Sequence, residues 1–308
     1  MVMVKRAFSQ GENLFPVALG TWAIGGNHWG GVEDKSSIEA LEAAIDSGFN
    51  IIDTAPVYGY GHSEELVGRA IKGKRDKVFI ATKCGLLWPG DVIKKNLTEA
   101  SIIFEVEHSL KRLGVDYIDL YQTHWPDINV SLEETYSTLL KLKKHGKIKH
   151  IGVCNVELDL LEEITKICPV ASVQNEYSFL KTKYGDDVFE YCSKNNISFF
   201  AYGSLAGGIL SGKYDKAPFF PKSDARSFMY QYYRGEAFNK AQAVAGRFKE
   251  VALKYNVPTP AAAIAWVMAQ RPFIFPLVGA KTKEQIKQNA LAAEVNLTKE
   301  DLDFLNGN

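Results

Sequence analysis

The chain has 308 residues, a length that suits one large α/β domain or two smaller ones. Hydrophobic residues make up 46% and charged residues 23%, which is ordinary for a soluble globular protein. Lys plus Arg and Asp plus Glu each number 36, so the formal net charge is zero. Without a basic excess, neither nucleic acid nor an anionic membrane is expected as the main partner.

The cysteines and the N-terminus indicate a cytoplasmic protein. Cys84, Cys154, Cys168 and Cys192 form no CxxC pair, and a chain of this size folds without crosslinks, so we expect reduced thiols. The first 15 residues lack the apolar core of a signal peptide, and no stretch approaches the ~20 apolar residues of a membrane span. A redox role for Cys84 or Cys154 stays open.

Short apolar runs that alternate with helical segments predict the fold. Asp34 is expected to cap the first helix, and Ser131 with Glu134 has the pattern of a capping box. The runs are rich in β-branched and aromatic residues and therefore predict strands. The predicted strands are 17–20, 50–53, 78–83, 117–124, 148–155, 171–175, 197–202 and 273–279.

About eight such repeats predict a (β/α)8 TIM barrel with extra helices and a long loop after the seventh strand. The rival is a doubly wound open sheet, which needs an early phosphate turn, but the sequence contains no GxGxxG. No linker divides the chain, so one domain is expected over 1–308. Residues 203–240 break the rhythm, and a connection of this length predicts a cofactor or substrate loop.

The ends of the predicted strands carry residues that suit chemistry, because a barrel gathers its site at the carboxyl ends of the strands. The chain has Asp53, Lys83 and His124 at three of these ends and Tyr58 just beyond the first of them. We expect the Lys83 ammonium to lower the tyrosine pKa from about 10, and Asp53 to hold Lys83 by an ion pair. A tyrosine so tuned suits a general acid for a carbonyl oxygen. The hydride must then come from a cofactor, because no side chain donates one.

Eight stretches in order match a known family. They are LGTWAIGG (19–26), GFNIIDTAPVYGYGHSEELVGRAI (48–71), IATKCG (80–85), SLKRLGVDYIDLYQTHWPD (109–127), GKIKHIGVCN (146–155), VQNEYS (173–178), AYGSLAGGILSGKY (201–214) and PLVGAKTKEQIKQN (276–289). The chain resembles the aldo-keto reductases over nearly its full length. The resemblance is closest to the bacterial branch, which is also similar to the potassium-channel β-subunits.

The resemblance implies reduction of aldehydes or ketones to alcohols by NADPH, with Tyr58 as proton donor and Asp53, Lys83 and His124 completing a catalytic tetrad. It implies a small-molecule carbonyl substrate. Trp22, Trp88 and Trp125 stand near the ends of predicted strands, so we expect them, with Tyr58 and His124, to contact that substrate; core packing is the alternative for the tryptophans. The implied residues for NADPH or NADP+ are Gly20, Thr21, Trp22, Asp53, Asn155, Gln174, Tyr202, Gly203, Ser204, Leu205, Ala206, Gly208, Lys213, Arg226, Gly279, Lys281, Thr282, Gln285, Gln288 and Asn289.

Three positions depart from the pattern of the family. Cys154 stands where serine is usual, and Ser204 stands where proline is common. Lys281 replaces a frequent arginine, and a lysine binds phosphate as a point charge without the arginine fork, which leaves NADH open. The alternative function is an NADPH-binding regulatory subunit with slow or vestigial reductase activity.

Other motifs predict less. The stretch GGILSGKY resembles a phosphate-binding P-loop, but Tyr214 replaces the Ser or Thr that would bind Mg²⁺. The six histidines form no HExxH and pair with no cysteine at ligand spacing, so no metal is expected. A Schiff-base enzyme using Lys83 is a third hypothesis, against which the expected ion pair with Asp53 argues. The physiological substrate, the reaction direction and the oligomeric state cannot be predicted.

Overall fold

A closed barrel of eight parallel strands forms the centre of the protein in a computed structural model that describes residues 4–26, 28–31, 33–90 and 92–307. The barrel strands are β3 (Ala18–Gly20), β4 (Ile51–Asp53), β5 (Phe79–Cys84), β8 (Ile118–Thr123), β9 (Ile148–Cys154), β10 (Ser172–Glu176), β11 (Ser198–Tyr202) and β12 (Ile274–Gly279). β12 pairs with β3, which closes the sheet and leaves no free edge. The predicted (β/α)8 barrel is confirmed, and every predicted strand forms within one residue of its expected ends.

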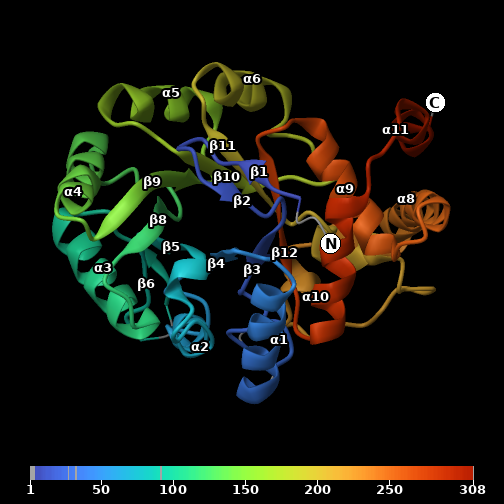
Figure 1. Cartoon of the computed structure of the whole chain (residues 1–308), viewed down its shortest axis with the longest axis horizontal. Coiled ribbons are helices and arrows are strands. Elements are labelled where there is room, and N and C mark those ends of the chain that lie inside the picture. Colours follow the sequence, from blue (N-terminus) through green and yellow to red (C-terminus); the bar gives the residue numbers. More distant parts are fainter. Residues whose placement is uncertain (1–3, 27, 32, 91, 308) are drawn as a thin grey trace.

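Helices surround the barrel in Figure 1. They are α1 (Asp34–Asp46), α2 (His62–Ala70), α3 (Glu99–Leu113), α4 (Leu132–Lys144), α5 (Leu158–Ile167), α6 (Asp186–Lys194), α7 (Ala225–Phe228), α8 (Gly235–Lys254), α9 (Thr259–Gln270), α10 (Lys283–Ala290) and α11 (Lys299–Asn306). Two hairpins complete the fold, β1 (Arg6–Ala7) with β2 (Asn13–Leu14), and β6 (Leu86–Leu87) with β7 (Lys94–Lys95). None of the helices among the described residues has both the length and the apolar character needed to cross a membrane.

Of the two predicted helix caps, one is wrong and the other forms in part. The predicted cap at Asp34 is wrong by one position: Glu33 is the N-cap, and Asp34 is the first helical residue. Ser131 does cap α4, because its Oγ accepts the N–H of Glu134 at 3.1 Å. The Glu134 carboxylate accepts instead from the N–H of Glu99 in α3, so the reciprocal half of the predicted capping box is absent.

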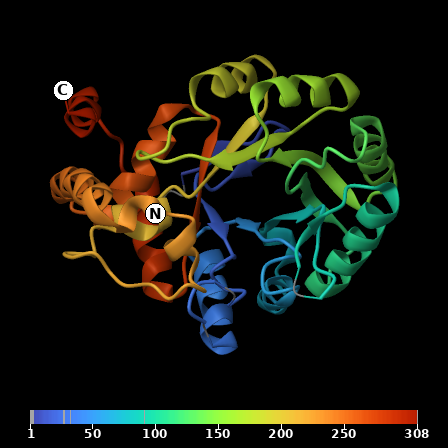
Figure 2. The ribbon, with the colours of Figure 1, turned by 180° about the vertical axis from the view of Figure 1, so that it is seen from behind.

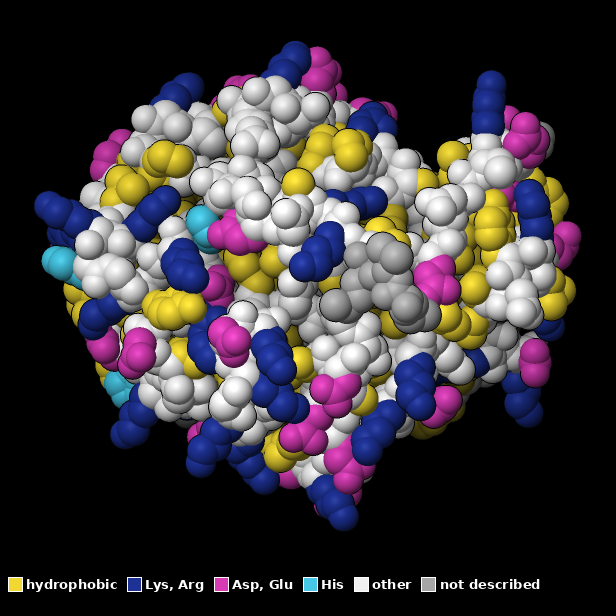
Figure 3. Space-filling model, in the orientation of Figure 1, with side chains coloured by type: hydrophobic (Ala, Val, Ile, Leu, Met, Phe, Trp, Pro, Cys, Tyr) yellow, Lys and Arg dark blue, Asp and Glu magenta, His cyan; other side chains and the backbone are white. Residues whose placement is uncertain are grey.

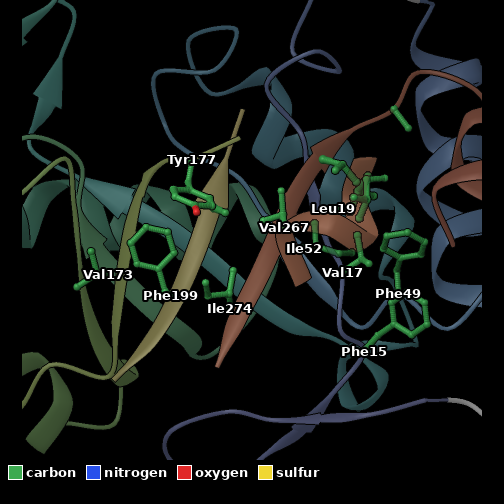
Figure 4. Packing of buried hydrophobic residues seen from close by; sticks show 14 of the residues in the cluster. Phe15, Val17, Leu19, Phe49, Ile52, Val173, Tyr177, Phe199, Val267 and Ile274 are labelled. Atoms are coloured by element: carbon green, nitrogen blue, oxygen red, sulfur yellow. The ribbon is translucent and has the colours of Figure 1, made fainter. Parts of the chain in front are cut away.

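The core consists of two layers, because side chains alternate between the two faces of each strand. Leu19, Ile52, Phe199 and Ile274 point outward and pack beneath the helices (Figure 4). The inward residues fill the lower barrel, and they are Ala18, Ile51, Phe79, Ala81, Leu120, Phe200 and Phe275. The strands therefore bury both faces, as expected for an all-parallel sheet.

The β1–β2 hairpin covers the end of the barrel where the strands begin. Phe8 lies against the inward Phe79 with ring centroids 5.2 Å apart, and the Ser9 N–H donates to Ser198 Oγ at 3.0 Å. The face that carries this hairpin shows positive and negative side chains interspersed in Figure 3. Any large cavity must therefore open at the opposite end, where the strands finish.

The long segment between β11 and α8 lies to one side of the barrel, at left in Figure 2. It contains a 3-10 turn at Ala206–Ser211 and the short helix α7. The N–H of Ala225 in this segment donates to His28 O at 2.7 Å, in the loop that follows β3. The predicted long loop after the seventh strand is thereby tied to the loop after the first.

Gly68 in α2 lies where the helices α2 and α3 approach closely, so a substitution there tests how tightly they pack. A Cβ added there would lie 2.6 Å from Arg112 O and 2.8 Å from Leu113 O, so α3 would have to move. We expect Gly68→Ala to lower the free energy of unfolding by about 1–3 kcal/mol, as overpacking does. Gly246→Ala in α8 is the control, because no described atom lies within 4 Å of its Cβ, and it should stabilise by about 0.5–1 kcal/mol. Urea unfolding followed by circular dichroism measures both, and equal effects would contradict the close packing.

Candidate active site

Side chains alternate between the two faces of each strand, and this alternation also determines which residues point into the barrel at the carboxyl ends of the strands. Two residues beyond Ile51 and Ala81, on the same inward face, the chain places Asp53 and Lys83. Three further strands contribute Gln122, Cys154 and Gln174 by the same period. The inward face thus changes from apolar to polar at the carboxyl ends of the strands.

A buried ion pair forms the centre of this layer. Lys83 Nζ lies 2.6 Å from Asp53 Oδ1, and both side chains are at most 2% exposed. The second carboxylate oxygen, Asp53 Oδ2, accepts from Gln174 Nε2 at 2.9 Å and from Gln122 Nε2 at 3.2 Å. Lys83 also donates to Thr54 O at 2.9 Å. The charges of both partners are therefore compensated by short polar contacts.

The charge state of Lys83 follows from these contacts. Burial is the largest single influence on the lysine pKa and lowers it, but the charge and hydrogen bond of Asp53, together with the neighbouring groups Tyr58 and Cys154, raise it by more, so the pKa is above its ordinary value. Lys83 is an ammonium at neutral pH. The expected ion pair between Asp53 and Lys83 is thus present in the structure.

Tyr58 lies above the ion pair on the loop between β4 and α2. Its hydroxyl is 3.4 Å from Lys83 Nζ, and its ring stacks on Trp22 at a centroid distance of 6.0 Å. His124 presents its ring edge-on to Tyr58, with centroids 5.9 Å apart. At Gly59, which has φ 61°, a Cβ would lie 2.3 Å from Gly25 O, so this loop approaches the loop after β3 closely.

The pKa of Tyr58 is raised, not lowered, so the direction expected from the sequence was wrong. Burial raises this pKa to about 12, although the Lys83 charge acts in the opposite direction. Burial also lowers the pKa of His124 well below its ordinary value, and the charge of Lys83 adds to that effect. At neutral pH the site therefore holds a protonated phenol beside a neutral imidazole.

A cavity of about 630 Å³ opens at this end of the barrel. Trp88, which was expected to contact the substrate, is not among the residues that line the cavity; its ring lies against the lining residue Tyr60, with centroids 5.8 Å apart. Four other residues singled out from the sequence do not line the cavity: Thr21, Lys83, Ala206 and Thr282. The remaining ones do, namely Gly20, Trp22, Asp53, Tyr58, His124, Trp125, Asn155, Gln174, Tyr202, Gly203, Ser204, Leu205, Gly208, Lys213, Arg226, Gly279, Lys281, Gln285, Gln288 and Asn289.

Thr21 and Thr282 have structural contacts instead. Thr21 is fully buried, and its Oγ1 donates to the backbone carbonyl of Asp53 at 3.0 Å. Thr282 caps α10, because its Oγ1 accepts the N–H of Gln285 at 3.3 Å. Each supports a segment that lines the cavity without lining the cavity itself.

One wall beside Tyr58 carries a chain of hydrogen bonds. Tyr202 donates its hydroxyl hydrogen to Asn155 Oδ1 at 2.8 Å, and Asn155 Nδ2 donates to the backbone carbonyl of His124 at 2.8 Å. Asn155 adopts a left-handed backbone with φ 58°, directly after β9. This turn brings its side chain into the cavity, although Cys154 occupies the inward strand position.

The far end of the cavity is cationic. Lys213, Arg226 and Lys281 all line it, and Lys281 Nζ donates to Trp29 O. Burial lowers the pKa of Lys281, and the nearby positive charges of Arg226 and Lys213 lower it further. Arg226 is held by Asp224, with Nη2 2.6 Å from Oδ2. Three cations crowded at one end of a cavity fit an anionic ligand.

Two of the cysteines lie near the site. Cys154 Sγ is 3.7 Å from Gln122 Oε1, and both Cys84 and Cys154 are 1% exposed. Burial raises the pKa of each thiol, so both are protonated at neutral pH.

One residue of the site escaped the sequence reasoning. Gln122 was not singled out, although it precedes His124 by two positions and therefore faces inward as Lys83 does. Strand alternation was the signal that could have found it. Phe228, Met229 and Tyr230 also line the cavity, and they belong to residues 203–240, the segment predicted from the sequence as a cofactor or substrate loop.

Comparison with known proteins places this geometry in a family. The model of the "Aldo/keto reductase family" matches residues 16–307. The aldo-keto reductase YhdN of Bacillus subtilis is 38% identical over 292 residues, covering 94% of this chain and 88% of that protein. The NADH-specific methylglyoxal reductase of Escherichia coli is 35% identical over 305 residues, with 94% and 93% covered.

The solved structures agree. The glycerol dehydrogenase of Gluconobacter oxydans superimposes with a TM-score of 0.92 at 37% identity, over 100% of this chain and 95% of that one. The fold, the site and these matches together define the protein as an oxidoreductase of the class that reduces carbonyl groups. The chain belongs to the aldo/keto reductase family.

The ion pair can be tested by its contribution to stability. We expect Asp53→Asn to lower the free energy of unfolding by about 3 kcal/mol, because Lys83 would remain as a buried charge without its partner. Asp34→Asn is the control, since Asp34 pairs with His62 and Arg69 at the surface and is 45% exposed. It should cost about 1 kcal/mol or less. Chemical denaturation of both variants measures the difference, and equal costs would contradict the account.

Proposed function

We propose that this protein reduces aldehydes or ketones to alcohols with NADPH and that Tyr58 donates the proton. The observation that carries the proposal is the position of Tyr58. Its hydroxyl is protonated at neutral pH, lines the cavity and has the Lys83 ammonium 3.4 Å behind it. A weak acid backed by a fixed cation suits an oxygen that gains negative charge during reaction.

The residues divide the work as follows. A bound nicotinamide cofactor supplies the hydride that adds to the carbonyl carbon. Tyr58 transfers its proton to the carbonyl oxygen as that oxygen becomes an alkoxide, and Lys83 stabilises the phenolate that remains. Asp53 keeps Lys83 in place and charged. His124, as a neutral imidazole, donates a hydrogen bond that orients the carbonyl oxygen.

The lining residues fit such a cofactor. Lys213, Arg226 and Lys281 would hold its phosphates, and Gln285 and Asn289 lie at the same end of the cavity. The amides of Asn155 and Gln174 and the ring of Tyr202 would hold the nicotinamide near Tyr58. We further propose that residues 203–240 act as the cofactor and substrate loop of a single domain spanning 1–308.

NADPH is the proposed cofactor because of the cations at the far end. A 2′-phosphate adds two negative charges that NADH lacks, and Lys281 is confined there with Arg226 and Lys213. One relative is named as NADH-specific, so the preference of this chain is a matter for measurement. Schiff-base chemistry on Lys83 is disfavoured, because that route needs a neutral amine and this lysine is held charged by Asp53.

Tyr58→Phe tests the proton donor. Removing the hydroxyl should lower kcat for 4-nitrobenzaldehyde reduction by about 10²–10⁴-fold, the usual contribution of general acid catalysis. The dissociation constant of NADPH, from quenching of protein fluorescence, should change less than twofold. Unchanged turnover would overturn the role of Tyr58. Tight NADPH binding by the wild type without reduction of any aldehyde would favour the regulatory alternative.

Lys281→Gln tests the cofactor preference. The variant should weaken NADPH binding by about tenfold, the cost of losing one hydrogen bond to a charged group, and leave NADH binding within twofold. Lys287→Gln is the matched control, because Lys287 lies on α10 but is exposed and does not line the cavity. If Lys281→Gln weakened the binding of NADPH and of NADH equally, this lysine would not be a contact to the 2′-phosphate.

A further inference from the structure

We infer that Gln122 is a positioning residue that fixes Asp53 and Gln174 together beneath the cavity. The inference rests on the proposed reduction of carbonyl compounds, in which Asp53 holds Lys83 and Gln174 holds the nicotinamide. Gln122 acts through these two residues and touches neither substrate nor cofactor.

Three side chains form a closed triangle of hydrogen bonds. Asp53 Oδ2 accepts from Gln122 Nε2 at 3.2 Å and from Gln174 Nε2 at 2.9 Å. Gln174 Nε2 also donates to Gln122 Oε1 at 3.4 Å. Each member is therefore held by the other two, and the loss of one loosens both of the others.

Gln122 is the hidden corner of this triangle. It is fully buried and is not among the residues that line the cavity, whereas Asp53 and Gln174 both line it. A molecule in the cavity can therefore touch two corners but not the third. Any effect of Gln122 on binding or on the reaction must pass through its two neighbours.

The partners of Gln122 determine which way its amide points. The ionised Asp53 carboxylate only accepts hydrogen bonds, so the amide must present Nε2 to it. On the other side, Gln122 Oε1 accepts from Gln174 and from the Cys154 thiol, whose sulfur is 3.7 Å away. A reversed amide would place its oxygen against the carboxylate and its nitrogen against two donors.

The strand between β8 and β10 leaves room for this side chain. Gln122 on β8 pairs in register with Gly152 on β9, and a Cβ at Gly152 would lie 2.9 Å from Gln122 Cγ. Because β9 has no side chain at that position, Gln122 can extend over it and reach Gln174 on β10. One side chain thus links two strands that are not neighbours.

The triangle joins the proton-donor side of the site to the cofactor side. Asp53 Oδ1 holds Lys83 at 2.6 Å, and Lys83 lies 3.4 Å from the Tyr58 hydroxyl. Gln174 Nε2 makes two hydrogen bonds within the triangle, so Gln174 Oε1 is the atom that remains to accept from the carboxamide of a nicotinamide. Gln122 therefore orients the partner of Lys83 and the amide of Gln174 at once.

Gln122→Met tests the inference, because methionine is also unbranched but has no N–H to donate and only a weak acceptor. The dissociation constant of the full-length variant for NADPH should rise about tenfold, as for the loss of one hydrogen bond. The dissociation constant for 2′-phospho-ADP-ribose, which lacks the nicotinamide, should change less than twofold. Isothermal titration calorimetry measures both.

Turnover of the same variant is the second readout. At saturating NADPH, kcat for 4-nitrobenzaldehyde should fall about tenfold because Asp53 is held less firmly, while KM for the aldehyde stays within twofold. Thr123→Val is the matched control, since Thr123 is the next residue on β8, is 2% exposed and bonds the Tyr136 hydroxyl of α4 at 3.2 Å. It should leave both dissociation constants and kcat within twofold.

Two results would overturn the inference. One is equal weakening of NADPH and of the nicotinamide-free fragment, which indicates a general distortion, and the other is unchanged binding and turnover in Gln122→Met. If that variant does not fold, Gln122→Asn keeps an amide but withdraws it by one methylene, and it should show the same difference between the two ligands. Failure of the wild type to reduce aldehydes would count against the proposed function alone, because the binding comparison needs no turnover.

Discussion

The buried ion pair between Asp53 and Lys83 is the interaction on which the upper barrel depends. Two full charges inside a protein are tolerated only when each is paired and hydrogen-bonded, because desolvation otherwise exceeds the attraction. Here Asp53 receives Lys83 on one oxygen and two glutamine amides on the other, at 2.6–3.2 Å. Asp53 and Lys83 come from the neighbouring strands β4 and β5, whereas the two glutamines come from β8 and β10, so the full set of contacts to Asp53 requires closure of the sheet.

That pair sets the chemistry of its neighbours. Lys83 remains charged because Asp53 and the other groups around it together raise its pKa by more than burial lowers it, and its charge then opposes the rise of the Tyr58 pKa that burial causes. The phenol keeps its proton until a stronger base, such as a nascent alkoxide, forms beside it. The same positive charge helps keep His124 neutral. One fixed cation thus influences both groups that line the cavity at the reaction centre.

Much of this arrangement could be predicted from the sequence, because the period of the strands and the residue types at their ends determine which side chains point into the barrel. The eight strands follow from apolar runs, and Asp53 and Lys83 fall on inward positions at the strand ends. Gln122 obeys the same parity and could have been found by it. The N-cap of α1 was missed by one residue, since Asp is a preferred cap residue, yet Glu33 takes that position without a side-chain cap hydrogen bond.

The sequence could not predict how deeply individual side chains are buried or which distant segments of the chain touch. The sign of the Tyr58 pKa shift depends on how completely loops bury the ring, and burial is a property of the folded chain. Trp88 was expected to contact the substrate, but Tyr60, whose ring is 5.8 Å from it, lines the cavity and Trp88 does not. The contact of His28 with Ala225 joins positions nearly two hundred residues apart, which no local pattern encodes.

The most direct test of the account is the ionisation of Tyr58 itself. Protein labelled with ¹³C at tyrosine Cζ can be titrated by NMR, with the Tyr58 signal assigned by its loss in Tyr58→Phe. The account predicts that this signal shows no ionisation below about pH 11, because burial raises its pKa to about 12. Ionisation of Tyr58 at or below pH 10, the ordinary value for a tyrosine, would contradict the claim that a buried, protonated phenol is the proton donor.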